Sequence, residues 1–174
     1  MPEKLSGHCA TRNWDAIYVI GSTLEDPYLK VFLFNITTSI WTRLAKDSDK
    51  IENPEIPRAR ENFACTLSIN KSKIFISGGI LSETNETLSD FYSFDTKAKR
   101  WSIQPNSLKP RSGHVMTNYR NFTTIMGGLC SDGIALGSME SFKSDEQWHV
   151  LDEKLTERKN FRVTQVPTNF LPQT

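Results

Sequence analysis

The fold is decided by residues 73–79, which read Lys-Ile-Phe-Ile-Ser-Gly-Gly. An apolar run that ends in two glycines predicts a short buried strand, followed by a backbone turn that glycine adopts more readily than other residues. The same pattern returns at residues 122–128, which end in Ile-Met-Gly-Gly, and in weaker form at residues 16–22, which end in Ile-Gly-Ser. The glycines that close these three strands are Gly21, Gly78, Gly79, Gly127 and Gly128. A motif that recurs roughly every 50 residues predicts a repeat architecture.

Two further elements recur in the same register. The first is a pattern of Gly or Asn, a ring, two variable residues and Thr, at residues 7–11, 62–66, 113–117 and 160–164. The second is a tryptophan that follows a short, mostly polar turn, at Trp41, Trp101 and Trp148. Because their large rings can bridge adjacent sheets, we expect these tryptophans to pack between neighbouring units. Each unit reads as four short strands separated by polar connections.

The expected strands can be placed in each unit. First strands are expected at about 7–12, 62–69, 113–119 and 160–166, and second strands at about 16–21, 73–78 and 122–127. Third strands are expected at 31–34, 91–94 and 139–142, and fourth strands begin at the tryptophans. We therefore divide a single region, residues 1–174, into repeats at about 6–56, 57–107 and 108–154, with a partial fourth repeat at 155–174.

The composition excludes several classes of protein. The net charge is +1 and charges of both signs are mixed along the chain, so no nucleic-acid-binding stripe is predicted. No apolar run approaches the ~18 residues of a membrane helix, and the first residues carry no secretory signal. The three cysteines, Cys9, Cys65 and Cys130, fit neither a zinc site nor a disulfide framework, so we expect small buried thiols. The predicted location is the cytoplasm, with the nucleus as the alternative.

Together these elements resemble the kelch repeat. The residues that carry the resemblance are Arg111-Ser112-Gly113-His114, Gly127-Gly128, Phe94-Asp95 and Trp101. The resemblance extends from residue 6 to about residue 166. It implies an all-β fold, part of a kelch-type β-propeller with one four-stranded antiparallel blade per repeat. The first unit departs from the family in having Ser22 after its glycine, and the third has Lys143 where Asp is usual.

The number of repeats raises a question about closure. Three full repeats and the start of a fourth are fewer than the roughly four to eight blades that close a propeller. Either the chain is a fragment of a longer propeller, or a second copy or another partner covers the apolar faces of its end blades.

No catalytic or metal site is recognisable. His8 and His114 share one repeat position with Phe63 and Phe161, and a position that accepts Phe is a packing position. We find no nucleophile motif, phosphate loop or metal-ligand cluster, so we expect no cofactor and no enzymatic activity. The alternative is an enzyme, because kelch-like propellers include galactose oxidase and a sialic-acid mutarotase. The copper ligands of such an oxidase cannot be assembled from this sequence.

The candidate binding residues are three arginines and one tryptophan. Arg60, Arg111 and Arg158 stand at one repeat position, three residues before the ring. Arginines near this position help to bind acidic peptides in kelch domains of ubiquitin-ligase adaptors, so the resemblance implies such a role here. The alternative is that the guanidinium groups hydrogen-bond to backbone or acidic groups of a neighbouring blade. Trp14 lies outside the repeat pattern, between the first two strands, and is the other candidate for a contact surface.

We therefore predict a protein–protein interaction module. Its specific form would be a substrate receptor or scaffold that binds an acidic peptide segment through loops on a rigid framework. Nothing in the sequence resembles the BTB or F-box domain that would connect it to a ubiquitin ligase. A further alternative is a self-associating half-propeller with a structural role.

Overall fold

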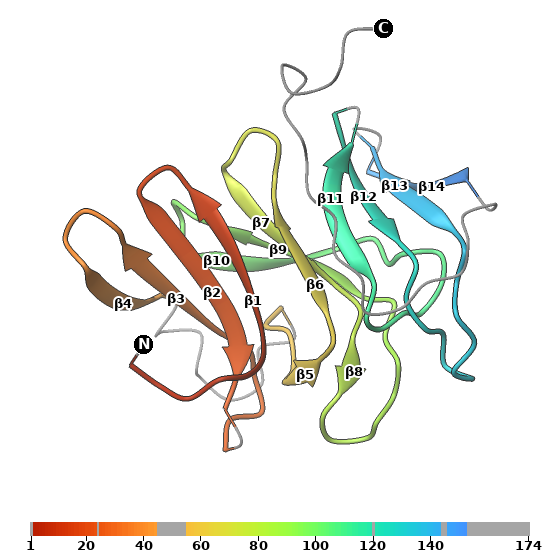
Figure 1. The fold of residues 1–174 in the computed structure, drawn as a ribbon, viewed down its shortest axis with the longest axis horizontal. Coiled ribbons are helices and arrows are strands. Elements are labelled where there is room, and N and C mark those ends of the chain that lie inside the picture. Colours follow the sequence, from red (N-terminus) through yellow and green to blue (C-terminus); the bar gives the residue numbers. More distant parts are fainter. Residues whose placement is uncertain (1, 24, 45–54, 120, 144–145, 153–174) are drawn as a thin grey trace, which may run out of the picture.

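The described part of the chain is built entirely from β-strands and their connections. The computed structural model describes residues 2–23, 25–44, 55–119, 121–143 and 146–152. Within these ranges the strands form three four-stranded antiparallel sheets and one two-stranded ribbon (Figure 1). The prediction of an all-β fold with four-stranded antiparallel units is confirmed. The expected fourth repeat lies outside the described residues.

Each large sheet contains four neighbouring, hydrogen-bonded strands. We call the three sheets blades 1, 2 and 3. Blade 1 comprises β1 (Ser6–Asn13), β2 (Ala16–Ser22), β3 (Lys30–Asn35) and β4 (Ile40–Leu44). Blade 2 comprises β6 (Ala64–Leu67), β7 (Lys73–Ser77), β9 (Phe91–Asp95) and β10 (Arg100–Gln104). Blade 3 comprises β11 (Val115–Tyr119), β12 (Phe122–Met126), β13 (Met139–Phe142) and β14 (Trp148–Asp152). The sequence did not predict the ribbon of β5 (Arg60–Glu61) and β8 (Ile80–Leu81).

The first strands of the three blades lie next to one another. Strand β6 contacts β1 on one side and β11 on the other. The remaining strands of each blade follow outward in order, so the blades fan out side by side (Figure 1). This arrangement gives each blade two ends. We call the end with residues 23–29, 58–61, 80–90 and 129–138 the loop end, and the end with the turns at 14–15, 36–39, 68–72 and 96–99 the hairpin end.

The apolar run of residues 74–76 is buried on both faces of blade 2. Ile74 and Ile76 point toward blade 1 and belong to a buried cluster with Tyr18, Ile20 and other residues. Phe75, between them, points the opposite way into a cluster with blade 3. Successive side chains of a strand face opposite sides of the sheet. An apolar strand without polar alternation is therefore expected in a blade that lies between two others.

The glycine pair of blade 2 allows the backbone of blade 3 to approach closely. Gly78 and Gly79 have φ angles of 56° and 97°. The amide of Gly79 donates a hydrogen bond of 2.9 Å to the carbonyl oxygen of Arg111. A Cβ atom on Gly78 would lie 2.4 Å from that same oxygen. Both the left-handed φ and the contact exclude a side chain at Gly78, so the repeated glycine is a packing requirement.

The Asn or Asp at the end of the third strand shapes the following turn. Asp95 Oδ1 accepts hydrogen bonds from the amides of Lys97 and Ala98, at 2.9 and 2.7 Å. These two hydrogen bonds lower the pKa of the Asp95 carboxyl. Asn35 Oδ1 accepts from the amide of Thr38 at 2.9 Å in blade 1. These side chains stabilise the hairpin in place of the glycine that tight hairpins usually contain.

The expectation of three reduced thiols is wrong for two of the cysteines. Cys9 in β1 and Cys65 in β6 form a disulfide, with Cα atoms 6.1 Å apart. Spacing along the chain did not suggest this pair, because the two residues are brought together only when the first strands of adjacent blades lie side by side. Cys130 is a free, half-buried cysteine, as expected. No described helix has the length and apolarity needed to cross a membrane.

Candidate functional site

Arg60 is buried in blade 2 and bound by groups of its own repeat. The residue as a whole is 1% exposed. It donates hydrogen bonds to the carbonyl oxygens of Arg58, at 2.9 Å, and Gly78, at 3.2 Å, and forms an ion pair with Asp90. Its guanidinium carbon lies 5.6 Å from the ring centroid of Tyr92. Burial, followed by the Asp90 charge, raises the pKa of Tyr92.

Arg111 occupies the corresponding position in blade 3 and is fully enclosed. It is 0% exposed and donates to the carbonyl oxygen of Gly127 at 2.9 Å and to Ser138 Oγ at 3.2 Å. It also forms an ion pair with Glu140, whose other carboxylate oxygen accepts a hydrogen bond of 2.9 Å from the amide of Leu108. Burial lowers the pKa of Arg111, whereas the Glu140 carboxylate raises it.

The two arginines make equivalent contacts. Each donates to the carbonyl of the first glycine of its own pair and each is neutralised by a carboxylate of its own blade. This geometry favours the structural alternative, with partners in the same blade and not in a neighbouring one. Arg158 lies outside the described residues. A direct role of these arginines in binding a partner stays a prediction.

Trp14 is exposed at the hairpin end. It lies in the turn between β1 and β2, has a φ of 51° and is 72% exposed. The Lys71 ammonium group lies 3.8 Å from the centroid of its ring, which is a cation–π geometry. An exposed large ring of this kind is available for contact with another molecule.

The three repeated tryptophans lie in different environments. Trp101 is buried in the cluster between blades 1 and 2, and Trp148 in the cluster between blades 2 and 3. The indole nitrogen of Trp148 donates to the carbonyl oxygen of Pro105 at 2.8 Å. Trp41 is half-buried and packs on Phe34, with ring centroids 4.9 Å apart, on the face of blade 1 that points away from blade 2. Trp101 and Trp148 thus lie between blades, and Trp41 lies on an end face.

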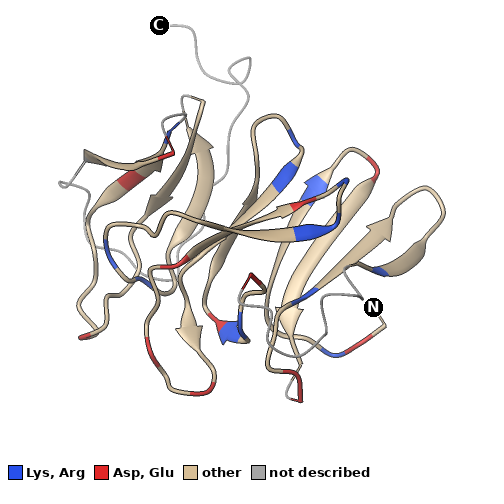
Figure 2. Cartoon of the chain, turned by 180° about the vertical axis from the view of Figure 1, so that it is seen from behind, with Lys and Arg blue, Asp and Glu red and all other residues tan. Residues whose placement is uncertain are grey.

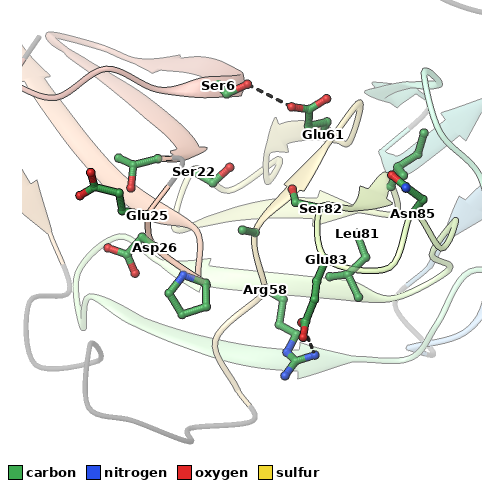
Figure 3. Close-up of a pocket in the computed structure, with 14 residues that line it drawn as sticks. Ser6, Ser22, Glu25, Asp26, Arg58, Glu61, Leu81, Ser82, Glu83 and Asn85 are labelled. Atoms are coloured by element: carbon green, nitrogen blue, oxygen red, sulfur yellow. Dashed lines mark hydrogen bonds and ion pairs between the residues drawn. The ribbon is translucent and has the colours of Figure 1, made fainter.

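A pocket of about 630 Å³ opens at the loop end, where blades 1 and 2 meet. Three segments form it: the ends of β1 and β2 with the loop that follows β2, the chain around β5, and β8 with the residues after it (Figure 3). Its apolar surface comes from Pro27, Ala59, Ile80 and Leu81. The sequence did not predict this site, because most of its residues come from loops that the repeat pattern does not mark.

The comparisons with known proteins identify the family. The family model of the KLHDC2/KLHL20/DRC7 Kelch-repeats domain matches residues 4–168. The chain belongs to the kelch-repeat family. The kelch resemblance predicted from the glycine pairs, rings and tryptophans is thereby confirmed.

Two known proteins resemble this kelch chain over most of its length. Kelch-like protein 41b of Danio rerio is 27% identical over 130 residues, which is 73% of this chain and 19% of that protein. The solved structure of YjhT superimposes with a TM-score of 0.69 at 14% identity, covering 88% of this chain and 53% of that one. The structural match supports the propeller fold. The chain spans about a fifth of the first relative and about half of the second.

The kelch pocket is predominantly acidic. Its charged lining residues are Glu25, Asp26, Glu61, Glu83 and Arg58. Figure 2 shows Asp and Glu on several loops at the lower end of the molecule, which is the loop end. The reversal from an expected cationic face to an acidic pocket has a physical cause. Arg60 and Arg111, which would have supplied positive charge, are buried and paired. Glu25 and Glu83 instead project from loops, and Glu61 from the short strand β5.

The pocket is lined by hydroxyl and carboxylate groups. In the part of the chain that the structure describes, no group of three or more His, Cys, Asp or Glu side chains is placed to hold a metal ion. Of its serines, Ser6 donates a hydrogen bond of 3.1 Å to a carboxylate oxygen of Glu61. The pocket is suited to binding a polar and charged segment by contact, with loops mounted on rigid sheets.

Proposed function

We propose that this kelch-repeat chain is a protein-interaction module that binds partners at its loop end. The observation that carries the proposal is the pocket where blades 1 and 2 meet. It combines an apolar surface with charged side chains and lies on loops held by packed sheets, which is the usual design of a recognition site. A role as a substrate receptor or scaffold is the specific form of this function.

Of the sequence-based candidates for binding, Trp14 remains part of the proposal. Trp14 offers an exposed ring at the hairpin end and would act as a second contact point. An acidic peptide bound by Arg60, Arg111 and Arg158 is less well supported, because the first two are buried and already paired with carboxylates. We propose instead that Arg60 and Arg111 act by holding the blades on which the loops are mounted.

Completion of the ring is a separate proposal. Three blades are described, whereas propellers contain roughly four to eight. We propose that further blades, from the same polypeptide or a second copy, cover the outward faces of blades 1 and 3. Light scattering of the purified chain tests the second copy, because a stable, monodisperse monomer at micromolar concentration would exclude self-association.

Neither catalysis nor a cofactor is part of the proposed function. Turnover of sugar substrates together with metal analysis would reveal the enzymatic alternative. The cytoplasmic location also stays a prediction. The Cys9–Cys65 disulfide counts against it, since disulfides persist mainly in oxidising compartments.

Affinity capture followed by partner identification and mapping tests the proposed function. The wild-type chain is compared with two variants: Leu81→Arg, which places a long charged side chain in the pocket, and Trp14→Ala, at the opposite end. Leu81 is buried, so thermal unfolding of Leu81→Arg is measured first to confirm that the variant folds. A partner that binds the wild type and is lost with the folded variant supports the loop end. A purified partner that binds both variants as tightly as the wild type would place recognition elsewhere.

A further inference from the structure

We propose that the pocket between blades 1 and 2 receives a basic segment of a partner protein, with a Lys or Arg side chain inserted among its carboxylates. This inference rests on the proposed function and specifies the chemistry of the ligand. It reverses the charge of the partner that the arginines had suggested.

The charge of the lining residues is the first argument. Four carboxylates and one guanidinium group line the pocket, a net charge of −3 from those five side chains. The cation, Arg58, lies 3.1 Å from Glu83 and forms an ion pair with it. Lys30, just outside the lining, pairs with Asp26 at 2.8 Å. Glu25 and Glu61 form no ion pair with a described residue, so a cationic ligand meets these two carboxylates in excess of the positive charge already present. An acidic ligand would meet like charges at close range, which disfavours binding.

The spatial arrangement of the carboxylates is the second argument. Figure 3 shows Glu25 and Asp26 on one side of the pocket and Glu83 on the other, with Glu61 at a third position. They come from three segments far apart in the sequence, so the convergence is a product of the fold. A guanidinium or ammonium group that enters the pocket therefore has carboxylates on more than one side.

The apolar part of the pocket is the third argument. Pro27, Ile80 and Leu81 offer a surface for the aliphatic stem of a long cationic side chain. Lys and Arg commonly bury their stems along apolar surface while their charged heads remain hydrated or paired. The combination of an apolar floor and acidic rim therefore fits Lys or Arg better than a small cation, which would gain nothing from the floor.

The local structure also holds one carboxylate in place before a ligand arrives. Glu61 belongs to β5, where it pairs with Ile80 of β8, and its side chain accepts the hydrogen bond from Ser6 of blade 1. A carboxylate fixed in this way loses little freedom on binding, which favours affinity. Glu25 and Glu83 are exposed and complete the rim.

The acidic character continues beyond the pocket. Glu86, in the loop after β8, and Asp132, in the loop between β12 and β13, are exposed at the same end. The opposite hairpin end carries exposed Lys71, Lys97 and Lys99. The two ends therefore differ in charge, and a basic segment is steered toward the loop end by the field of the molecule.

Fluorescence anisotropy with two synthetic peptides tests the inference. One is a ten-residue peptide of alternating Arg and Ala, and the other has Glu in place of Arg. The pocket variant is Glu25→Gln, Glu61→Gln, Glu83→Gln. The matched control is Asp15→Asn, Glu86→Gln, Glu146→Gln, which changes the charge equally at exposed positions outside the pocket lining. Thermal unfolding is measured for both variants to confirm that they fold.

We expect the basic peptide to bind the wild type. Its dissociation constant should be about tenfold or more higher for the pocket variant, and within about threefold of the wild-type value for the control. Binding should weaken as salt is raised. Equal losses in the two variants would show general charge attraction and overturn the pocket assignment. Absence of binding of the basic peptide overturns the ligand class.

One outcome separates this inference from the proposed function. Tighter binding of the acidic peptide, or capture of a purified partner unaffected by the pocket variant but abolished by Leu81→Arg, would refute a basic ligand and leave the protein-binding function intact. Failure of the function itself would be seen as loss of all specific capture by the wild-type chain.

Discussion

The boundary between blades 1 and 2 and the boundary between blades 2 and 3 solve one packing problem with different chemistry. The first contains the larger apolar cluster, a disulfide between the innermost strands and the Arg60–Asp90 pair, whose carboxylate is partly exposed. The second contains a smaller apolar cluster together with the buried Arg111–Glu140 pair and a buried histidine, His114. The difference shows that the kelch repeat fixes backbone geometry but leaves the stabilising chemistry of each boundary open.

The polar boundary should be the more sensitive to loss of one group. Arg111 and Glu140 have side-chain exposures of 0% and 1%, whereas Asp90, which pairs with Arg60, is 23% exposed. Breaking a fully buried pair leaves a charge without compensation, and breaking a partly exposed pair allows water to replace the partner.

Loss of the Glu140 carboxylate should have the largest effect. We expect Glu140→Ala to reduce the free energy of unfolding by about 3–5 kcal/mol, because Arg111 would remain buried without its counter-charge. Asp90→Ala should cost clearly less. Urea denaturation of the two variants measures both values, and equal costs would remove the distinction between the two boundaries.

Substitution of Gly78 should have the next largest effect. A Cβ at this position meets the carbonyl oxygen of Arg111 at 2.4 Å, and the backbone has a φ of 56°. We expect Gly78→Ala to cost about 3–4 kcal/mol, from the combination of backbone strain and steric overlap. Gly133→Ala is the control for strain alone, since its φ is 79° and no atom lies within 4 Å of the added Cβ. Its cost should be about 1 kcal/mol. Similar melting temperatures for the two variants would mean that blade 3 moves away from the added methyl group and so relieves the steric overlap.

Removal of the disulfide should weaken the first boundary. Cys9→Ser with Cys65→Ser should lower the free energy of unfolding by about 2–4 kcal/mol, because the bond closes a long loop of chain. Treatment of the wild type with a thiol reductant should give the same midpoint in urea. Cys130→Ser is the control and should leave the midpoint unchanged.

The smallest effect concerns pH and the second boundary. Burial, with a further contribution from the Arg111 charge, lowers the pKa of His114 to about 3 from 6.5. In the unfolded chain the imidazole binds a proton more readily than in the fold. The stability associated with its neutral form is therefore complete above about pH 6.5 and is lost as the pH falls toward 3.

Replacement of His114 by phenylalanine isolates this contribution. In the described residues, neither ring nitrogen of His114 has a hydrogen-bond partner, and Phe63 occupies the same repeat position in blade 2. We expect His114→Phe to be more stable than the wild type by about 1–2 kcal/mol at pH 5, with a smaller difference at pH 8. If the difference in stability between His114→Phe and the wild type is the same at pH 5 and pH 8, the histidine does not titrate as its burial implies.

The sequence was sufficient for the features that repeat. The strands fall close to the expected ranges, since the apolar run around Phe75 and the glycine pairs reflect packing that each blade must satisfy. The shared ring position was correctly interpreted as a packing site at His114 and Phe63, which are both buried. The interpretation was wrong for His8, which is exposed on the first strand of blade 1. These features depend on local backbone geometry, which the residue types specify directly.

The features that do not repeat were missed. In blade 3, Ser138 stands at the repeat position of Asp90, and the carboxylate comes from Glu140, at the position of Tyr92. Comparison of the repeats therefore did not reveal which acid neutralises which arginine. The acidic pocket was missed for a related reason, since it depends on how loops of unequal length meet in space.

The disulfide between the innermost strands also changes how the chain would respond to a pulling force. Cys9 and Cys65 are separated by 56 positions, and the bond between them closes the intervening chain into a loop. A force applied to the two termini passes through the bond and cannot extend that loop. Fully extended, such a segment would span about 190 Å, a length that stretching would release only after reduction. Blade 1 and the first strand of blade 2 would therefore bear tension as one mechanical unit.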